Sequence, residues 1–201
     1  MMRRGSHACV SERESQPNAG RSLALAIVVA TALAGCGFSS GQIPTTRDAQ
    51  SLPGRGCVER GGLPDVRCTP GAVRAGVSLA TICAYSYTRS VRPPERYTEA
   101  LKITQIREYH LPGRVSDYEE DHLIALSIGG APTSPANLWP EPRNGPNNAE
   151  QKDRLETWAA RMACAQRIPL QRLQGEMAGN WLGLYRAAGG PRALDAYPPG
   201  G

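Results

Sequence analysis

The pattern of apolar residues and breaks around Gly129-Gly130 constrains the fold more than any other feature. Asp121 and His122 stand at the end of a segment that predicts a strand, and the apolar run 123–126 that follows them is short enough to be a buried strand. Gly129-Gly130 ends the run, because glycine adopts turn conformations that larger residues resist. After a loop rich in Pro, Thr, Ser and Asn, residues 137–139 predict a return strand, which we expect Pro140 and Pro142 to stop.

Three helices are expected from capping residues and apolar spacing. The first covers residues 95–108, directly after two prolines, which are favoured at a helix start. The second begins near residue 149, where Asn147 or Asn148 is suited to cap it. The third covers residues 169–187. Apolar residues recur at helical spacing in the last two helices: Leu155, Trp158, Ala159, Met162, Leu173, Met177, Trp181 and Leu184.

Three motifs within this order of strand, loop, strand and helix resemble the HNH endonuclease family. They are Asp-His-Leu-Ile-x-Leu-x-x-Gly-Gly at 121–130, Asn-Leu-Trp-Pro-Glu-Pro at 137–142, and Asn-Ala-x-x-Lys-Asp-x-Leu-Glu at 148–156. Together with residues 81–94, they look closest to a group of small secreted bacterial HNH-like proteins. The resemblance covers roughly residues 68–185. It implies an α+β fold with a ββα-metal core, flanking helices and disulfide crosslinks.

The resemblance also implies roles for individual residues. His122 would be the general base, because a neutral histidine accepts a proton from water near neutral pH. Asp121, which also counts among the catalytic residues, and Asn148 would hold one divalent cation. Carboxylate and amide oxygens suit Mg²⁺, or alternatively Mn²⁺. Asn137 would brace the catalytic loop, its amide holding the chain between the two strands.

The chain departs from the family at the start of the motif helix. The family often has a histidine there, whereas the three histidines of this chain all lie elsewhere. Asn148 is therefore the preferred second ligand. The alternatives are other oxygen-bearing residues near the helix start: Asn144, Asn147 and Glu150. We expect Lys152 and Arg143 to bind the substrate.

The N-terminal segment is typical of an exported lipoprotein. Residues 23–34 form an apolar run too short to span a bilayer, with arginines before it and small residues after it. The run ends in Leu-Ala-Gly-Cys, which resembles a bacterial lipobox, so we expect a signal peptide at 1–35 and lipidation of Cys36. Residues 36–56 would be a flexible tether. The lipid would anchor the product to the cell envelope, in the periplasm or on the outer surface.

Four cysteines follow the expected lipidation site. An even number in an exported chain favours two disulfides. Three pairings are possible, and we favour two bonds. Cys57–Cys68 would close a loop rich in Gly and Pro, and Cys83–Cys164 would tie the N-terminal part to the end of the motif helix. A zinc site is the alternative, but the sequence has no Cys-x-x-Cys motif or Cys/His cluster.

The domain itself is expected to cover residues 57–187. Its first part, 69–94, is expected to be irregular or partly stranded. Five residues there could face nucleic acid: Tyr85, Tyr87, Arg89, Val91 and Arg92. Alternatively, the tyrosines pack against the core and the arginines are solvated. Residues 188–201, rich in Gly and Pro, are expected to form a disordered tail.

Charge gives a weaker indication of the partner. The net charge is +5, and residues 1–35 carry four Arg and two Glu, so the remainder carries +3. This bias fits a polyanionic partner without demanding one. We expect a monomeric, membrane-anchored, metal-dependent endonuclease with little sequence specificity that cuts DNA or RNA, with DNA favoured. The alternative is a non-catalytic cell-envelope lipoprotein that retains the HNH scaffold.

Overall fold

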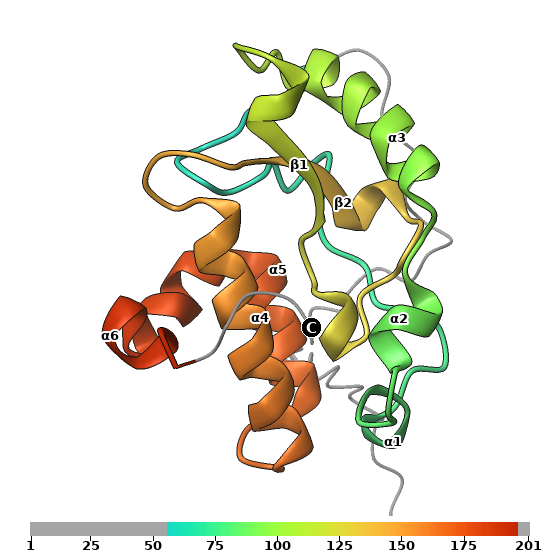
Figure 1. The fold of residues 1–201 in the computed structure, drawn as a ribbon, viewed down its shortest axis with the longest axis vertical. Helices are drawn as coiled ribbons and strands as arrows, with labels where there is room; N and C mark the ends of the chain where they lie inside the picture. Colours follow the sequence, from blue (N-terminus) through green and yellow to red (C-terminus); the bar gives the residue numbers. More distant parts are fainter. Residues whose placement is uncertain (1–55, 197–201) are drawn as a thin grey trace, which may run out of the picture. The chain divides into compact units, whose positions relative to one another are not determined.

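The fold is a mixed α+β arrangement built around one antiparallel hairpin. The structure, a computed structural model, describes residues 56–196. Figure 1 shows α3 beside the hairpin and α4, α5 and α6 grouped together, and α3 contacts both strands. The elements in chain order are α1 (Leu79–Ile82), α2 (Tyr87–Val91), α3 (Glu95–Glu108), the 3-10 turn η1 (Val115–Asp117), β1 (Tyr118–His122), the 3-10 turns η2 (Leu126–Ile128) and η3 (Pro135–Asn137), β2 (Leu138–Pro142), α4 (Ala149–Cys164), α5 (Leu170–Ala187) and α6 (Gly190–Leu194).

Strand β2 is longer than expected, because it contains both Pro140 and Pro142. The hydrogen bond from Leu123 N to Asn137 O, 2.8 Å, joins odd-numbered residues across the hairpin. The register pairs residues of equal parity, so even-numbered residues direct their backbone groups away from the partner strand. A proline is tolerated there, since its missing N–H is not needed by the hairpin. The prediction that Pro140 stops this strand is therefore wrong, whereas the strand does end at Pro142.

The apolar run 123–126 is buried, but it is not a strand. β1 ends at His122, and the chain turns into η2. The side chain of Asn137 takes the place of a neighbouring strand, accepting from Ile124 N at 2.9 Å and donating to Ile124 O at 3.0 Å. Because a side chain satisfies both backbone groups of Ile124, the run is buried without a third strand.

Helices α4 and α5 pack against each other and against η2 to form the main core (Figure 1). The predicted apolar stripes supply their buried residues: Leu155, Ala159, Leu173, Met177, Trp181 and Leu184. Trp158 and Met162 lie at the edge of this core. The predicted extents of α3 and α5 are confirmed, and α4 begins at Ala149 with Asn148 as its cap.

Helix α5 contains a kink that the sequence did not reveal. Asn180 has φ −166° and ψ 78°, and its Oδ1 accepts from Gly183 N at 2.9 Å. It therefore caps the second part of the helix from within. Next to the kink, Trp181 donates from Nε1 to Gly62 O at 2.8 Å. This bond connects α5 to the N-terminal part of the domain.

The expected disordered tail contains an ordered helix. α6 covers Gly190–Leu194, and Leu194 is completely buried in the core shared with α4 and α5. Packing of this leucine outweighs the unfavourable Gly and Pro content of the segment. Residues 197–201 lie outside the described part of the chain.

Residues 69–94 form short helices instead of strands. α1 and α2 lie here, and Val73 makes an isolated bridge to Gly130. The two tyrosines of this segment have opposite environments, since Tyr87 is buried in the core whereas Tyr85 is 99% exposed.

Both predicted disulfides, Cys57–Cys68 and Cys83–Cys164, are present. The second joins the residue after α1 to the last residue of α4 across a sequence separation of 81. A native disulfide in a small disulfide-bonded domain typically contributes about 2–5 kcal/mol to stability.

The expected signal peptide, Cys36 and most of the tether lie in residues 1–55, outside the described part of the chain. Between residues 56 and 196, no helix has the length and apolarity needed to cross a bilayer.

Gly130 is a position where only glycine fits. A Cβ atom there would lie 1.7 Å from Ile124 O, which is backbone and cannot rotate away. We expect Gly130→Ala to destabilise the domain by at least about 1–3 kcal/mol, the usual cost of overpacking. Gly175→Ala is the control, because its Cβ would meet nothing within 4 Å and alanine favours a helix by about 1 kcal/mol. Equal urea midpoints for the two variants would contradict this prediction.

Candidate functional site

A single buried lysine connects the beginning of α4 with the end of β1. Lys152 has a completely buried side chain. Its Nζ donates to Asp121 Oδ2, to the backbone oxygen of His122 at 2.8 Å, and to Glu156 Oε1. These bonds use all three donors of the ammonium group. The helix start and the strand end are therefore fixed to each other by one side chain.

The ammonium group faces more carboxyl groups than it can neutralise. Glu141 of β2 is also completely buried, with Oε2 3.9 Å from Lys152 Nζ. Burial raises the pKa of Glu141 well above its ordinary value and that of Glu156 to about 8. Burial alone would also raise the pKa of Asp121, but the positive charge of the Lys152 ammonium holds it below its ordinary value. Asp121 is therefore the carboxylate that stays ionised.

Asp121 shares its face of the hairpin with other acidic residues. Side chains alternate along a strand, and the register pairs Glu119 with Glu141 and Asp121 with Trp139, so these four lie on one face. Burial, followed by the charges of Asp121 and Glu119, raises the pKa of Asp153 on α4 to about 7. Asp153 makes no ion pair or side-chain hydrogen bond within the described chain. An unneutralised carboxyl group thus lies near Asp121.

His122 is held in one tautomer by the loop between the strands. Its Nε2 lies 2.9 Å from Pro132 O. A carbonyl oxygen only accepts, so Nε2 carries the proton and Nδ1 is the basic nitrogen. Burial lowers the pKa of His122, and the negative charge of Asp121 offsets only part of this effect. The ring, 5% exposed, is therefore neutral near pH 7, which is the form that accepts a proton.

Asn137 makes the contacts expected of a bracing residue. Besides its two bonds to Ile124, its amide accepts from Ala72 N at 3.3 Å and donates to Ala131 O at 3.2 Å. The side chain is completely buried. It therefore joins three chain segments around the loop that carries Pro132.

The candidate ligands near the helix start have other partners. Asn148 is the N-cap of α4: its Oδ1 accepts from Gln151 N at 3.2 Å and its Nδ2 donates to Gly145 O at 3.0 Å. Asn147 donates to Gly61 O at 2.9 Å, and Glu150 pairs with Arg154 at 2.7 Å. Asn144 is exposed. Asn147 and Asn148 are both partly buried, and Asn148 is the one that caps the helix.

The acidic face fits a hard divalent cation held partly by water. Within residues 56–196, no three His, Cys, Asp or Glu side chains converge to hold a metal ion by themselves. Asp121 is ionised, with a side chain 15% exposed, and Asp153 is an unpaired carboxyl group near it. Mg²⁺ keeps several waters and needs only one or two carboxylates. The donor set is therefore suited to Mg²⁺ and unsuited to a metal that requires a closed protein site.

The two residues expected to bind substrate differ in accessibility. Arg143 is half exposed, donates to Tyr118 O at 3.3 Å and pairs with Glu119 at 2.6 Å. Lys152 is completely buried and has all its donors occupied, so a phosphate cannot reach its ammonium group. The expectation that Lys152 binds substrate is corrected to a role inside the domain.

Sequence reasoning missed three members of the site, namely Glu141, Asp153 and Glu156. One of them had a detectable signal, because Glu156 follows Lys152 by four residues on a helix, where opposite charges meet. Glu141 precedes a proline in a segment expected to end, so nothing indicated that its side chain would be buried beneath α4.

Comparisons with protein-family models, with curated proteins and with solved structures each gave no match to this chain.

Proposed function

We propose that this protein is a metal-dependent HNH-type endonuclease that hydrolyses phosphodiester bonds in DNA, and secondarily RNA. We further propose that it is exported and lipid-anchored through Cys36 and that β1, β2 and α4 form a ββα-metal core. The main support is the environment of His122: a neutral imidazole with Nε2 bonded to Pro132 O, one residue from an ionised Asp121. Lys152 brings the helix start to this strand end.

The residues have distinct parts in the reaction. Nδ1 of His122 would take a proton from water as the water oxygen bonds to phosphorus and the bond to the leaving oxygen breaks. The resulting imidazolium would be stabilised by the carbonyl of Pro132 and the charge of Asp121. The N-terminus of α4 favours an anion near it, which suits the scissile phosphate.

A cation would complete this arrangement. Asp121, together with Asn148 or Asp153, would hold Mg²⁺ or Mn²⁺, which when bound neutralises charge on the phosphate and leaving oxygen. Lys152 would hold Asp121 in position, and its positive charge would help to keep the Asp121 carboxylate ionised.

The second candidate function is a non-catalytic cell-envelope protein on the same scaffold. It is favoured by the ion pair between Lys152 and Asp121, because an ammonium group already neutralises the carboxylate that would bind the cation. The neutral His122 favours the enzyme, since a buried histidine with a free basic nitrogen is not required for folding.

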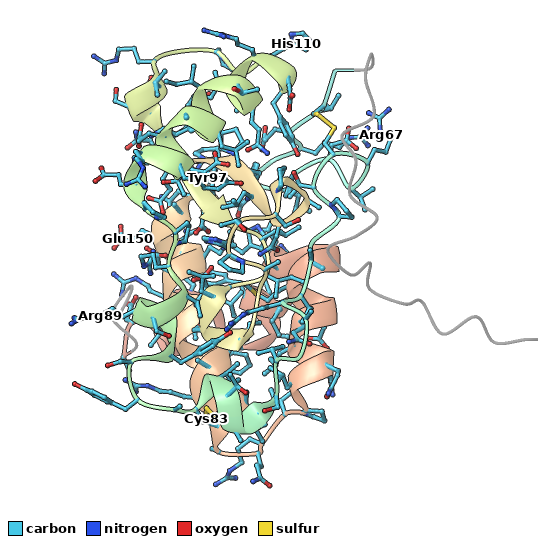
Figure 2. The ribbon with its side chains drawn as sticks, turned by 90° about the vertical axis from the view of Figure 1, so that its right-hand side faces the viewer. Arg67, Cys83, Arg89, Tyr97, His110 and Glu150 are labelled. Carbon is cyan, nitrogen blue, oxygen red and sulfur yellow. A yellow bond between two sulfur atoms is a disulfide. The ribbon has the colours of Figure 1, made fainter. Side chains whose placement is uncertain are left out.

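Plasmid digestion distinguishes the two candidates. The purified, oxidised protein should convert supercoiled plasmid to nicked and linear forms with Mg²⁺ or Mn²⁺, and EDTA should stop the reaction. His110→Ala should cut normally, because His110 is exposed and, in Figure 2, lies at the far end of the domain from Cys83. No cleavage with either metal by the folded protein would favour the non-catalytic function.

A further inference from the structure

Arg74 and Arg92, both in the segment before α3, have no acidic partner. Within the part of the chain that the structure describes, neither Arg74 nor Arg92 makes an ion pair or a side-chain hydrogen bond, and both are exposed. The cations Lys102, Arg143 and Lys152 are each paired with a carboxylate. Arg74 and Arg92 are therefore available to an external anion.

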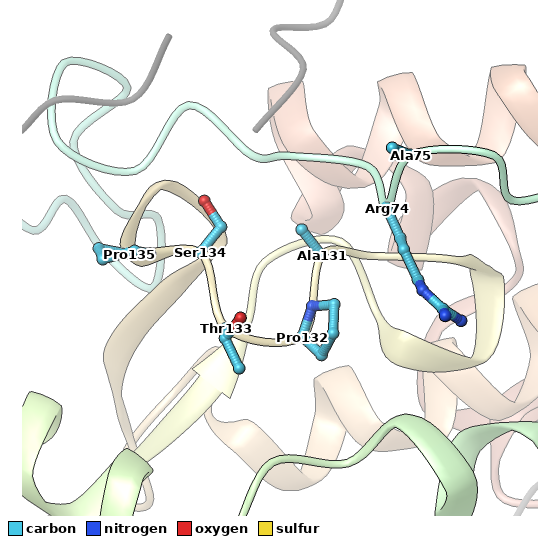
Figure 3. A pocket seen from close by; sticks show the side chains of 7 residues that line it. All are labelled: Arg74, Ala75, Ala131, Pro132, Thr133, Ser134 and Pro135. Carbon is cyan, nitrogen blue, oxygen red and sulfur yellow. The ribbon is translucent and has the colours of Figure 1, made fainter. Parts of the chain in front are cut away.

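Arg74 borders a pocket that shares a wall with His122. The pocket has a volume of 420 Å³ and is lined by Arg74, Ala75 and residues 131–135. Figure 3 shows the side chains of Arg74, Pro132 and Thr133 pointing to the same side. Pro132 is also the residue whose carbonyl accepts from His122. A group bound in this pocket would thus lie next to the histidine, and the volume falls in the range of roughly 300–1,000 Å³ that ligand pockets occupy.

Helix α2 carries Arg92 and supports Arg74. The guanidinium carbon of Arg74 lies 6.0 Å from the ring centroid of Tyr87, a buried residue of α2. Arg92 is the C-cap of the same helix. Helix α2 also contacts η2, the turn that lies a few residues after His122.

This helix is firmly attached to the rest of the domain. Tyr87 is part of the main core, and Val91 packs against it. The preceding segment is crosslinked to α4 through Cys83–Cys164. In Figure 2, Arg89 of α2 and Glu150 at the start of α4 extend from the same side of the domain. The arginines of this segment are thus held on a rigid support.

We propose that Arg74 and Arg92 form a phosphate cradle that binds backbone phosphates of duplex DNA next to the scissile bond. The inference rests on the proposed function and names the contacts that hold its substrate. This face of the hairpin holds more carboxyl groups than Lys152 can neutralise, so binding of a polyanion needs positive charge beside it. A guanidinium suits this task, because its fork of donors matches phosphate oxygens and its charge is permanent.

The test measures binding without cleavage. A short fluorescein-labelled DNA duplex is titrated with the full, oxidised protein in EDTA, by fluorescence anisotropy, over a series of NaCl concentrations. Each of Arg74→Gln and Arg92→Gln should weaken binding and reduce the slope of log K against log salt by about 0.9, the effect of one lost phosphate contact. In the variant that carries both substitutions, the slope of log K against log salt should fall by the sum of the two single effects. Arg107→Gln, an exposed arginine of α3, should keep the wild-type slope.

The outcomes separate this inference from the proposed function. Wild-type slopes for both cradle variants, or no measurable binding by the wild-type protein, would overturn the cradle. Circular dichroism confirms that each variant is folded. If the protein binds through the cradle but cuts no plasmid with Mg²⁺ or Mn²⁺, the cradle stands and the nuclease proposal fails. If it cuts plasmid and both variants bind and cut as the wild type does, only the cradle fails. A matching RNA duplex shows whether the cradle prefers B-form DNA.

Discussion

Cleavage of plasmid by the His122→Ala variant should be about 10²- to 10⁴-fold slower than by the wild-type protein, the usual contribution of a general base. The reason is the tautomer: Nε2 donates to Pro132 O at 2.9 Å, which leaves Nδ1 as the basic nitrogen of a neutral ring. The variant loses this base, while the hydrophobic core of α4 and α5 is unchanged. Rates are measured with Mg²⁺ at saturating concentration, and circular dichroism confirms folding.

The pH dependence of the wild-type rate provides an independent check. His122 must be neutral to act as a base, and burial lowers its pKa. The acidic limb of the rate profile should therefore lie below the ordinary histidine value of about 6.5. The His122→Ala variant should lack this limb, whereas His110→Ala should retain it. A folded His122→Ala variant that cuts at the wild-type rate would show that His122 is not the base.

Lys152→Met should destabilise the domain by about 3–5 kcal/mol, the typical cost of removing one partner from a buried ion pair. Methionine has a similar length, so the main loss is the ammonium group that serves Asp121, Glu156 and the backbone of His122. Lys102→Met is the matched control, because Lys102 is also buried but the side chain of its partner Glu99 is 48% exposed. Urea unfolding at pH 8 should give the larger loss for Lys152→Met; equal losses would contradict the prediction.

The loss should also depend on pH. In the wild-type protein, the depressed pKa of Asp121 stabilises the fold above its unfolded value of about 3.9, and this contribution is lost as pH falls. Without the ammonium group, burial would raise the pKa of Asp121 and of Glu156 in the folded state. Ionising them would then cost folding free energy, so the variant should be least stable relative to the wild type at high pH. The difference between variant and wild type should therefore shrink from pH 8 to pH 5.

The helices and crosslinks were predictable because their signals are local or follow from cysteine count. Asn148 caps α4, prolines precede α3 and α5, and four cysteines form the two expected bonds. The run 123–126 was mistaken for a strand because a sequence does not show that one asparagine side chain would satisfy Ile124. Leu194 was assigned to a disordered tail because burial of a single leucine depends on the shape of α4 and α5.

The site was predictable in its residue types and less so in its connections. Asp121 and His122 stand next to each other in the sequence. The helix cap at Asn148 indicates that the chain returns there to the end of the strand that carries them. The sequence does not show that Lys152 points inward, because lysine is most often exposed. The burial of Lys152 follows only from the structure, in which the strand register places the buried Glu141 on the side of β2 that faces Lys152.

The outward backbone edges of the hairpin have a consequence for association between chains. On β2, Pro140 and Pro142 offer no N–H, and the carbonyl of Leu138 is taken by Gln105 at 2.8 Å. On β1, cationic side chains cover the carbonyls of Tyr118 and His122. An exposed strand is normally a template for intermolecular β-pairing, and prolines and basic side chains are common protections against it. This small sheet therefore resists growth into larger β-aggregates even at high local concentrations of the domain.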